Sequence, residues 1–268
     1  MKKIVILLSI LLLLVGCSGN KAEESLSVDE LYDLALEAID AERYEEALNY
    51  FMQCIEAGDK DAYFDVGLMY YYGEGIEKDD AKALEYFEKG ADAGDGYSAE
   101  MAGWFYEQGI GTAVNEEKAL EWYQKGAALG HSGCLMRVGW FYDKGIVVEQ
   151  DEAKAVEYYR QSAEAGEAWS QRVMGLYYLD GTILEQDYEK AFEWFTKAIE
   201  NGDTWSYYYM AYMYHEGLYV EASNEKAKEY LENAVDTGDP DIIEAIKADI
   251  EDGYLNEDAI PDNLKAAG

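Results

Sequence analysis

Residues 59–94 read DKDAYFDVGLMYYYGEGIEKDDAKALEYFEKGADAG, and this 36-residue stretch recurs in altered form through most of the chain. The same step of 36 residues, without insertion, separates the members of several columns. These are Gly58, Gly94, Gly130, Gly166, Gly202 and Gly238; Ala47, Ala83, Ala119, Ala155, Ala191 and Ala227; Gly67, Gly103, Gly139 and Gly175, with Ala211 next; and Tyr70, Tyr106, Tyr142, Tyr178 and Tyr214. Self-similarity at such a period is the signature of a repeat architecture.

Each unit predicts two helices. Apolar residues at helical spacing indicate a first helix over about 61–72, and Gly73 offers the left-handed position that ends it. A second helix is expected over about 80–93, with Ala83, Leu84, Phe87 and Ala91 facing inward and Gly94 at its end. The residues before the second helices are all good N-caps: Asp79, Asn115, Asp151, Asp187 and Ser223.

Small residues in these columns suggest close packing between the two helices. We expect Gly67, Ala83 and their equivalents to let the helix backbones approach, with tyrosine and Phe87-type rings beside them. A helix pair of this length is marginal alone in water, so each copy depends on its neighbours. The pattern therefore predicts an all-α, right-handed α-solenoid (superhelix) of stacked antiparallel helix pairs.

The motif around Gly67-Leu68-Met69-Tyr70, Gly73-Glu74-Gly75-Ile76 and Ala83-Leu84-Glu85-Tyr86-Phe87 resembles the Sel-one-like repeat of the tetratricopeptide-like superfamily. Five such units are expected, at 59–94, 95–130, 131–166, 167–202 and 203–238. Segment 28–58 lacks the Gly-x-Gly loop and is closer to a plain tetratricopeptide capping repeat; 239–268 is expected to be a capping helix (240–252) followed by a loose tail. The resemblance implies an interaction scaffold, in bacteria often connected with signalling complexes, envelope assembly or host contact.

The amino terminus indicates export. Lys2 and Lys3 precede an apolar run, 4–15, that is too short to span a membrane and is typical of a signal peptide over 1–16. Leu14-Val15-Gly16-Cys17 resembles the lipobox of bacterial lipoproteins, which implies a lipidated Cys17, a flexible tether over 17–27, and a protein held on the extracytoplasmic face of the bacterial cell envelope. The alternative is an ordinary secretory leader with a chance cysteine.

Two more cysteines, Cys54 and Cys134, lie more than two repeats apart in this register. A disulfide needs Cα atoms within about 7 Å, so buried free thiols are the favoured interpretation and a bridge is the alternative.

Composition excludes one class of partner. The chain has 21 Lys and Arg against 56 Asp and Glu, a net charge of −35, whereas nucleic-acid binding depends on cations that neutralise phosphates. A nucleic-acid partner is therefore not expected.

Catalytic motifs are missing from the sequence. It contains neither a Gly-x-Ser-x-Gly elbow nor a phosphate-binding Gly-x-x-x-x-Gly-Lys-Ser/Thr loop, and its two histidines, His131 and His215, are too far apart in sequence to suggest a ligand pair. The acidic turns lack the pattern of a calcium loop. We therefore expect no enzyme activity, no cofactor and no metal site.

A regular lysine column has two interpretations. Lys82, Lys118, Lys154, Lys190 and Lys226 are either a charge ladder for a partner or, as favoured here, a solvated helix face.

The first helices carry the candidate site. In the tetratricopeptide superfamily these helices line a concave groove, and the resemblance maps four columns onto it. They are Tyr97, Trp169 and Trp205; Phe64, Met136, Arg172 and Tyr208; Trp104, Trp140 and Tyr212; and Tyr71, Glu107, Asp143 and His215. Aromatic residues beside carboxylates suit a protein or peptide partner, including a basic one. The Trp104 column could instead pack only against neighbouring helices.

The predicted function is therefore a membrane-anchored, non-catalytic scaffold that binds a protein or peptide. Two rivals remain. One is a cell-envelope enzyme or its glycan-binding accessory, with Trp and Tyr stacking on sugars; the other is a lipoprotein whose solenoid only spaces or protects the envelope.

Overall fold

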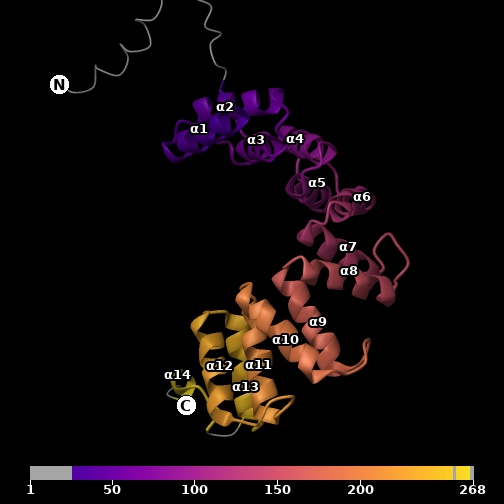
Figure 1. Cartoon of the computed structure of the whole chain (residues 1–268), viewed down its shortest axis with the longest axis vertical. Coiled ribbons are helices and arrows are strands. Elements are labelled where there is room, and N and C mark those ends of the chain that lie inside the picture. Colours follow the sequence, from indigo (N-terminus) through magenta and orange to yellow (C-terminus); the bar gives the residue numbers. More distant parts are fainter. Residues whose placement is uncertain (1–25, 256–257, 266–268) are drawn as a thin grey trace, which may run out of the picture.

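The computed structural model describes residues 26–255 and 258–265, in which every regular element is a helix. The predicted signal peptide and Cys17 lie outside these residues. Helix pairs follow one another along an arc, shown in Figure 1. The bounds are α1 (Val28–Asp40) and α2 (Tyr44–Glu56); α3 (Ala62–Tyr72) and α4 (Asp80–Asp92); α5 (Gly96–Gln108) and α6 (Glu116–Ala128); α7 (Ser132–Lys144) and α8 (Glu152–Glu164); α9 (Ala168–Asp180) and α10 (Tyr188–Glu200); α11 (Trp205–Glu216) and α12 (Asn224–Asp236); then α13 (Pro240–Glu251) and α14 (Asp262–Lys265). The all-α repeat solenoid is confirmed.

The predicted helix boundaries follow from their caps. Asp79 Oδ1 accepts a hydrogen bond from the backbone N–H of Lys82 at 3.0 Å, and the other four residues of the N-cap column make the same contact. Each first helix from α3 to α11 ends on a left-handed glycine, as at Gly73 with φ 76°. The backbone N–H of Asp79 also donates to the carbonyl of Tyr70 at 3.0 Å, which closes the loop between the two helices.

The glycine inside each first helix makes room for an aromatic ring. A Cβ atom on Gly67 would lie 2.5 Å from Cε1 of Phe87, a fully buried side chain. The same relation joins Gly103 to Tyr123, Gly139 to Tyr159 and Gly175 to Phe195. The nearest atoms to these glycines are thus ring atoms of the second helix, and at Gly139 the backbone carbonyl oxygen of Ala155 also lies 3.3 Å from the added Cβ.

The lysine column packs on the tyrosine column. Lys82 Nζ lies 5.2 Å from the ring centroid of Tyr70, and the four later repeats have equivalent pairs at 4.8 to 5.3 Å. Lys154 and Lys190 also form ion pairs with the N-cap aspartates Asp151 and Asp187, at 3.2 and 3.0 Å. These ammonium groups are thus engaged within their own repeats, which favours the structural interpretation of the column.

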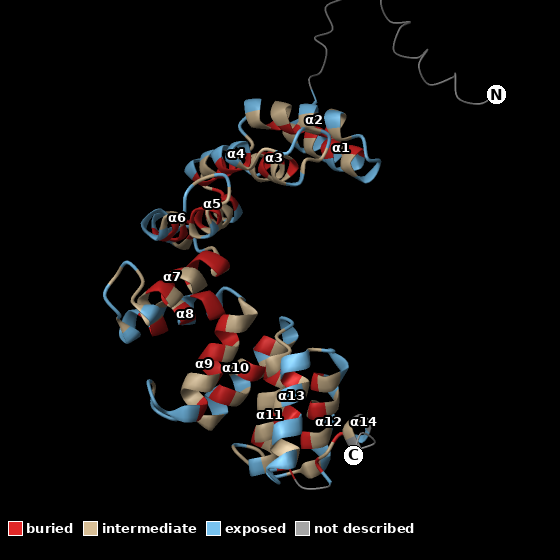
Figure 2. Ribbon diagram, turned by 180° about the vertical axis from the view of Figure 1, so that it is seen from behind, coloured by how far each residue is buried: buried red, intermediate tan, exposed pale blue. Residues whose placement is uncertain are grey.

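Buried residues form a continuous series of clusters between the helices, seen as red bands in Figure 2. Ala83, Leu84, Phe87 and Ala91 are all buried, as predicted. Cys54 and Cys134 are buried free thiols, which confirms the favoured interpretation.

The carboxyl-terminal segment corrects one expectation. The capping helix is present as α13, but the residues after it are not a loose tail, because Leu255 and Ala259 are buried against Ile242 and Ile246 of α13. These apolar side chains cover the last helix pair, which has no further repeat to shield it. The terminal cap therefore includes both α13 and the segment that follows it.

Candidate functional site on the first helices

The predicted groove residues lie on α3, α5, α7, α9 and α11, and they form separate groups rather than one aromatic floor. At the amino-terminal end, the rings of Phe64 and Tyr97 are 5.9 Å apart, and those of Tyr71 and Trp104 are 6.1 Å apart. Tyr97 is 62% exposed and packs edge-on against His131, the N-cap of α7, at 4.5 Å. Of the predicted aromatics, Tyr97 is therefore freest to meet a partner.

The middle of this face is occupied by contacts within the chain. Trp140 packs against Phe141 and beneath the guanidinium of Arg137, which lies 5.7 Å from its ring centroid. Glu107 accepts hydrogen bonds from Arg137 at 2.9 Å and from the hydroxyl of Tyr123 at 2.7 Å. Because Trp140 is half-buried and Glu107 is already hydrogen-bonded, these two side chains offer little surface to a ligand.

Two more predicted residues also have partners. Trp169 packs edge-on against buried Tyr159, at 5.3 Å between ring centroids. Arg172 Nε donates to Asp203 Oδ1 at 3.0 Å, and Asp203, just before α11, also accepts from the backbone N–H of Ser206 at 2.8 Å. Arg172 therefore joins two repeats.

A cavity of about 430 Å³ opens between α9 and α11 and includes two predicted residues, Tyr208 and Tyr212. Its described lining is Leu176, Leu179, Asp180, Gln186, Tyr188, Tyr208, Tyr209, Tyr212 and Leu218. Leu176 stands in the Trp104 column and Leu179 in the Tyr71 column, so the cavity lies on the predicted groove. The sequence analysis did not predict three of these residues, Asp180, Tyr188 and Tyr209. Asp180 is the last residue of α9 and Tyr188 the first of α10. Tyr209 was not apparent because none of the earlier repeats has an aromatic residue at its position.

The charge of this cavity is negative. Asp180 is the one charged side chain among the described lining residues, and it is exposed, whereas four tyrosines and three leucines supply the remaining walls apart from Gln186. Burial raises the pKa of Tyr208, as does its hydrogen bond to Asp249, so this ring stays a neutral phenol. The cavity thus combines aromatic and aliphatic surface with a carboxylate.

The terminal cap forms a border of this region. The ring of Tyr254 stacks on Tyr212 at 6.1 Å, and its hydroxyl donates to Glu216 at 2.8 Å. Trp205 packs against Tyr208 at 6.0 Å, while the hydroxyl of Tyr208 donates to Asp249 of α13 at 2.7 Å. Tyr208, Tyr212 and Trp205 are therefore partly covered by the chain's own end.

At the other end of the face, the carboxyl group of Asp65 has a raised pKa. It is half-buried and accepts a hydrogen bond from Tyr32 at 2.6 Å. Burial raises the pKa of Asp65 to about 6, and the neighbouring acids Asp59, Asp61 and Asp95 add to this effect, while the bond from Tyr32 opposes it.

In the described part of the chain, no group of three or more His, Cys, Asp or Glu side chains is arranged to hold a metal ion. None of the helices described there combines the length and hydrophobicity that crossing a membrane requires.

Comparison with a model of a known repeat family identifies five repeats in the chain. The Sel1 repeat profile matches residues 60–95, 97–131, 132–167, 170–203 and 206–239, which together are more than half of the chain. No curated protein sequence matches the chain.

Solved structures share the fold. A Sel1 repeat protein from Oxalobacter formigenes is 24% identical, with a TM-score of 0.74 over 90% of this chain and 96% of that one. The protective antigen c5321 of uropathogenic Escherichia coli, described as displaying an SLR fold, is 23% identical, with a TM-score of 0.72 over 87% of this chain and 50% of that one. The immunity protein PA5088 from Pseudomonas aeruginosa is 18% identical, with a TM-score of 0.52 over 80% and 83% of the two chains. On the five matched repeats and the helix pairs that they form, the chain belongs to the Sel1 repeat family.

Proposed function

We propose that this protein is a non-catalytic scaffold, anchored through a lipid on Cys17 to the extracytoplasmic face of a bacterial membrane, that binds a protein partner along its first helices. Sel1 repeat proteins generally mediate protein–protein interactions, which supports the binding role. The anchor rests on the lipobox-like sequence alone, and the partner site rests on the cavity between α9 and α11.

The chemistry of that cavity favours a basic segment of the partner. A lysine or arginine side chain can lay its aliphatic stem against tyrosine and leucine while its charge faces aromatic rings and Asp180. Each of these interactions is modest in water, but they act together at one site. The net charge of −35 adds long-range attraction for a cationic partner.

The cavity suggests a direct test with synthetic peptides. Peptides of one length that carry lysine or arginine, glutamate, or neutral residues at the central positions would be titrated by fluorescence anisotropy at low and high salt. We expect the basic peptides to bind preferentially and more weakly at high salt, because screening reduces the attraction. Equal binding of the acidic peptides would exclude the proposed specificity.

Variants locate the site. Asp180→Asn should weaken binding of the basic peptide by about three- to tenfold, because it removes the cavity's charge while preserving its shape. Glu193→Gln, an exposed change on α10, is the matched control and should leave binding unchanged. Trp205→Ala, which removes the ring that packs on the cavity residue Tyr208, should lower capture of the natural partner in a crosslinking pull-down from intact cells; undiminished capture would exclude Trp205 from the interface.

The anchor is tested separately. Cells fed a labelled fatty acid should incorporate it into the wild-type protein, and a Cys17→Ser variant should lose both the label and membrane association. Label retained in that variant would show that Cys17 is not the acylated residue.

A further inference from the structure

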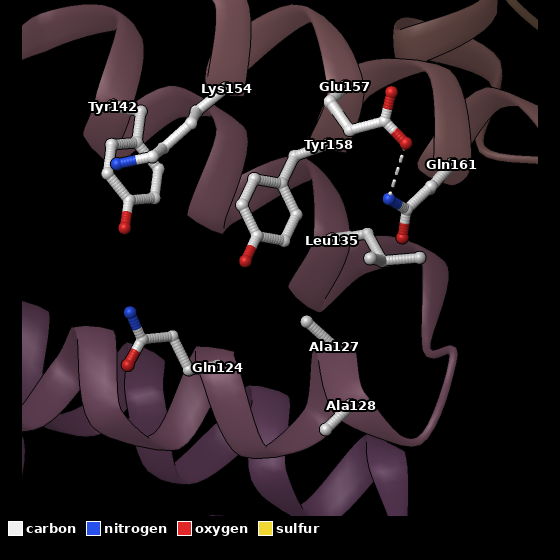
Figure 3. Close-up of a pocket in the computed structure, with 9 residues that line it drawn as sticks. All are labelled: Gln124, Ala127, Ala128, Leu135, Tyr142, Lys154, Glu157, Tyr158 and Gln161. Atoms are coloured by element: carbon white, nitrogen blue, oxygen red, sulfur yellow. Dashed lines mark hydrogen bonds between the residues drawn. The ribbon is translucent and has the colours of Figure 1, made fainter. Parts of the chain in front are cut away.

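A second cavity lies between α6 and α8, on the second helices rather than on the first-helix face. Its volume is about 430 Å³, and Figure 3 shows its lining. The described residues are Gln124, Ala127 and Ala128 of α6; Leu135 and Tyr142 of α7; and Lys154, Glu157, Tyr158 and Gln161 of α8. Sequence reasoning did not single out this site.

The preceding junction has two contacts that this one lacks. Between α4 and α6, the hydroxyl of Tyr106 donates to Glu88 at 2.8 Å, and Lys125 forms an ion pair with Asp92 across the two helices. The first contact joins α5 to α4, and the second joins the second helices α4 and α6.

One repeat later, the residues that would make both contacts have changed. Gln124 replaces Glu88, and Ala128 and Gln161 replace Asp92 and Lys125. Neither Ala128 nor Gln161 is charged, so no ion pair can form there, and the amide of Gln161 donates to Glu157 on its own helix at 2.9 Å. The cavity occupies the position that the bridges fill in the earlier junction.

Three neutral polar groups face this space. In Figure 3 the hydroxyls of Tyr142 and Tyr158 and the amide nitrogen of Gln124 point into the gap between α6 and α8. Within the described residues, neither hydroxyl nor the Gln124 amide makes a hydrogen bond, whereas the equivalent hydroxyl of Tyr106 makes two. The rings of Tyr142 and Tyr158 stack at 5.8 Å with an interplanar angle of 7°, which holds the hydroxyls side by side.

The charged residues at the rim are already paired. Lys154 forms an ion pair with Asp151 at 3.2 Å and lies over the ring of Tyr142, while Glu157 pairs with Arg160. Among the described lining residues, a phosphate or carboxylate ligand would therefore find no unpaired cation, and the net charge of −35 would repel it. These observations favour a ligand that is polar, uncharged and rich in hydroxyl groups.

The geometry points to a site for a neutral saccharide, a mono- or disaccharide unit, in the cavity between α6 and α8. Phenol hydroxyls and carboxamides both donate and accept hydrogen bonds, as sugar hydroxyls require. Ala127, Leu135 and the tyrosine rings supply apolar surface for the C–H face of a sugar ring. The volume falls within the range of about 300–1,000 Å³ that is usual for small-molecule sites. Because its lining comes mainly from second helices, this site is separate from the proposed peptide groove and independent of it.

Binding is tested on the full-length protein. Neutral sugars (glucose, galactose, mannose, N-acetylglucosamine and their disaccharides) would be compared with glucuronic acid and sugar phosphates by saturation-transfer NMR. The strongest ligand would then be titrated by calorimetry. We expect at least one neutral sugar to bind at millimolar concentration or below and the charged sugars to bind more weakly. Failure of every neutral sugar to bind, or preference for the charged ones, would overturn the proposal.

The earlier junction supplies the variant that closes the site. Ala128→Asp together with Gln161→Lys rebuilds the Asp92–Lys125 bridge, so the variant should fold as well as the wild type and lose sugar affinity by about tenfold or more. Tyr158→Phe, which removes one hydroxyl, should weaken binding by about three- to tenfold. Asn233→Lys on α12 makes an equivalent change two repeats away and should leave the affinity unchanged. Full affinity in the folded double variant would show that the sugar binds elsewhere.

Discussion

The glycine–ring contact predicts a specific coupling between Gly175 and Phe195. A Cβ atom on Gly175 would meet three ring atoms of Phe195 at 2.6, 2.7 and 3.0 Å, and the ring has no exposed surface. Phe195 also stacks on Tyr209 at 5.2 Å, so it cannot move away freely. Gly175→Ala should therefore overpack the core.

The expected magnitude is a difference of two effects. Overpacking costs about 1–3 kcal/mol, and the close contacts here place the cost near the upper end. Replacing glycine by alanine inside a helix returns about 1 kcal/mol. We expect Gly175→Ala to lower the free energy of unfolding by roughly 2 kcal/mol.

The last repeat shows how the chain itself resolves the conflict. There Ala211 occupies the glycine column and Leu231 occupies the ring column, and both are buried. Phe195→Leu alone should destabilise by about 1 kcal/mol through the space that it opens. The double variant should recover stability, with a coupling energy of about 1–2 kcal/mol in a double-mutant cycle.

The assay is urea unfolding of all four proteins, followed by far-UV circular dichroism and by tryptophan fluorescence. Coincidence of the two signals checks that one transition is being measured, since repeat arrays can unfold in stages. A Gly175→Ala variant as stable as the wild type, or a coupling energy of zero, would refute the proposed ring contact.

Two further predictions concern single carboxylates. The pKa of Asp65, raised to about 6 by burial, lies above its unfolded value, so the folded protein takes up this proton more readily and stability gains as pH falls from about 6 to 4. Asp65→Asn should remove this gain and stabilise the protein at pH 7 by roughly 1–2 kcal/mol. Unfolding curves of both proteins between about pH 4 and 7 would show this difference. An identical pH dependence in the two proteins would contradict the raised pKa of Asp65. Asp151→Ala removes the N-cap of α8 and should cost about 1 kcal/mol in thermal or urea unfolding, whereas Asp151→Asn should retain most of the stability; equal losses in both would exclude capping as the cause.

The sequence by itself determined the repeat, its period and the helix boundaries. These depend on local chemistry: Gly73 and its equivalents adopt a left-handed conformation, and Asp79 and its equivalents cap the following helix. Both effects act within a few residues, so a spacing in the chain is enough to reveal them. The inward-facing residues of each second helix could also be predicted, because helical spacing is a local property of the sequence.

Only the tertiary structure decided which surfaces are open. Trp140 and Trp169 share columns with exposed or cavity-lining residues, yet their neighbours partly cover them, because burial depends on the side chains that the fold packs beside each ring, such as Tyr159 against Trp169. The terminal cap shows the same limit: Tyr254 reaches Tyr212 from 42 positions further along the chain. The cavity between α6 and α8 likewise brings together Gln124, Ala128 and Gln161, at positions where the junction between α4 and α6 has bridging residues. Each substitution is unremarkable in the sequence, and the cavity follows only when the fold brings their side chains to one place.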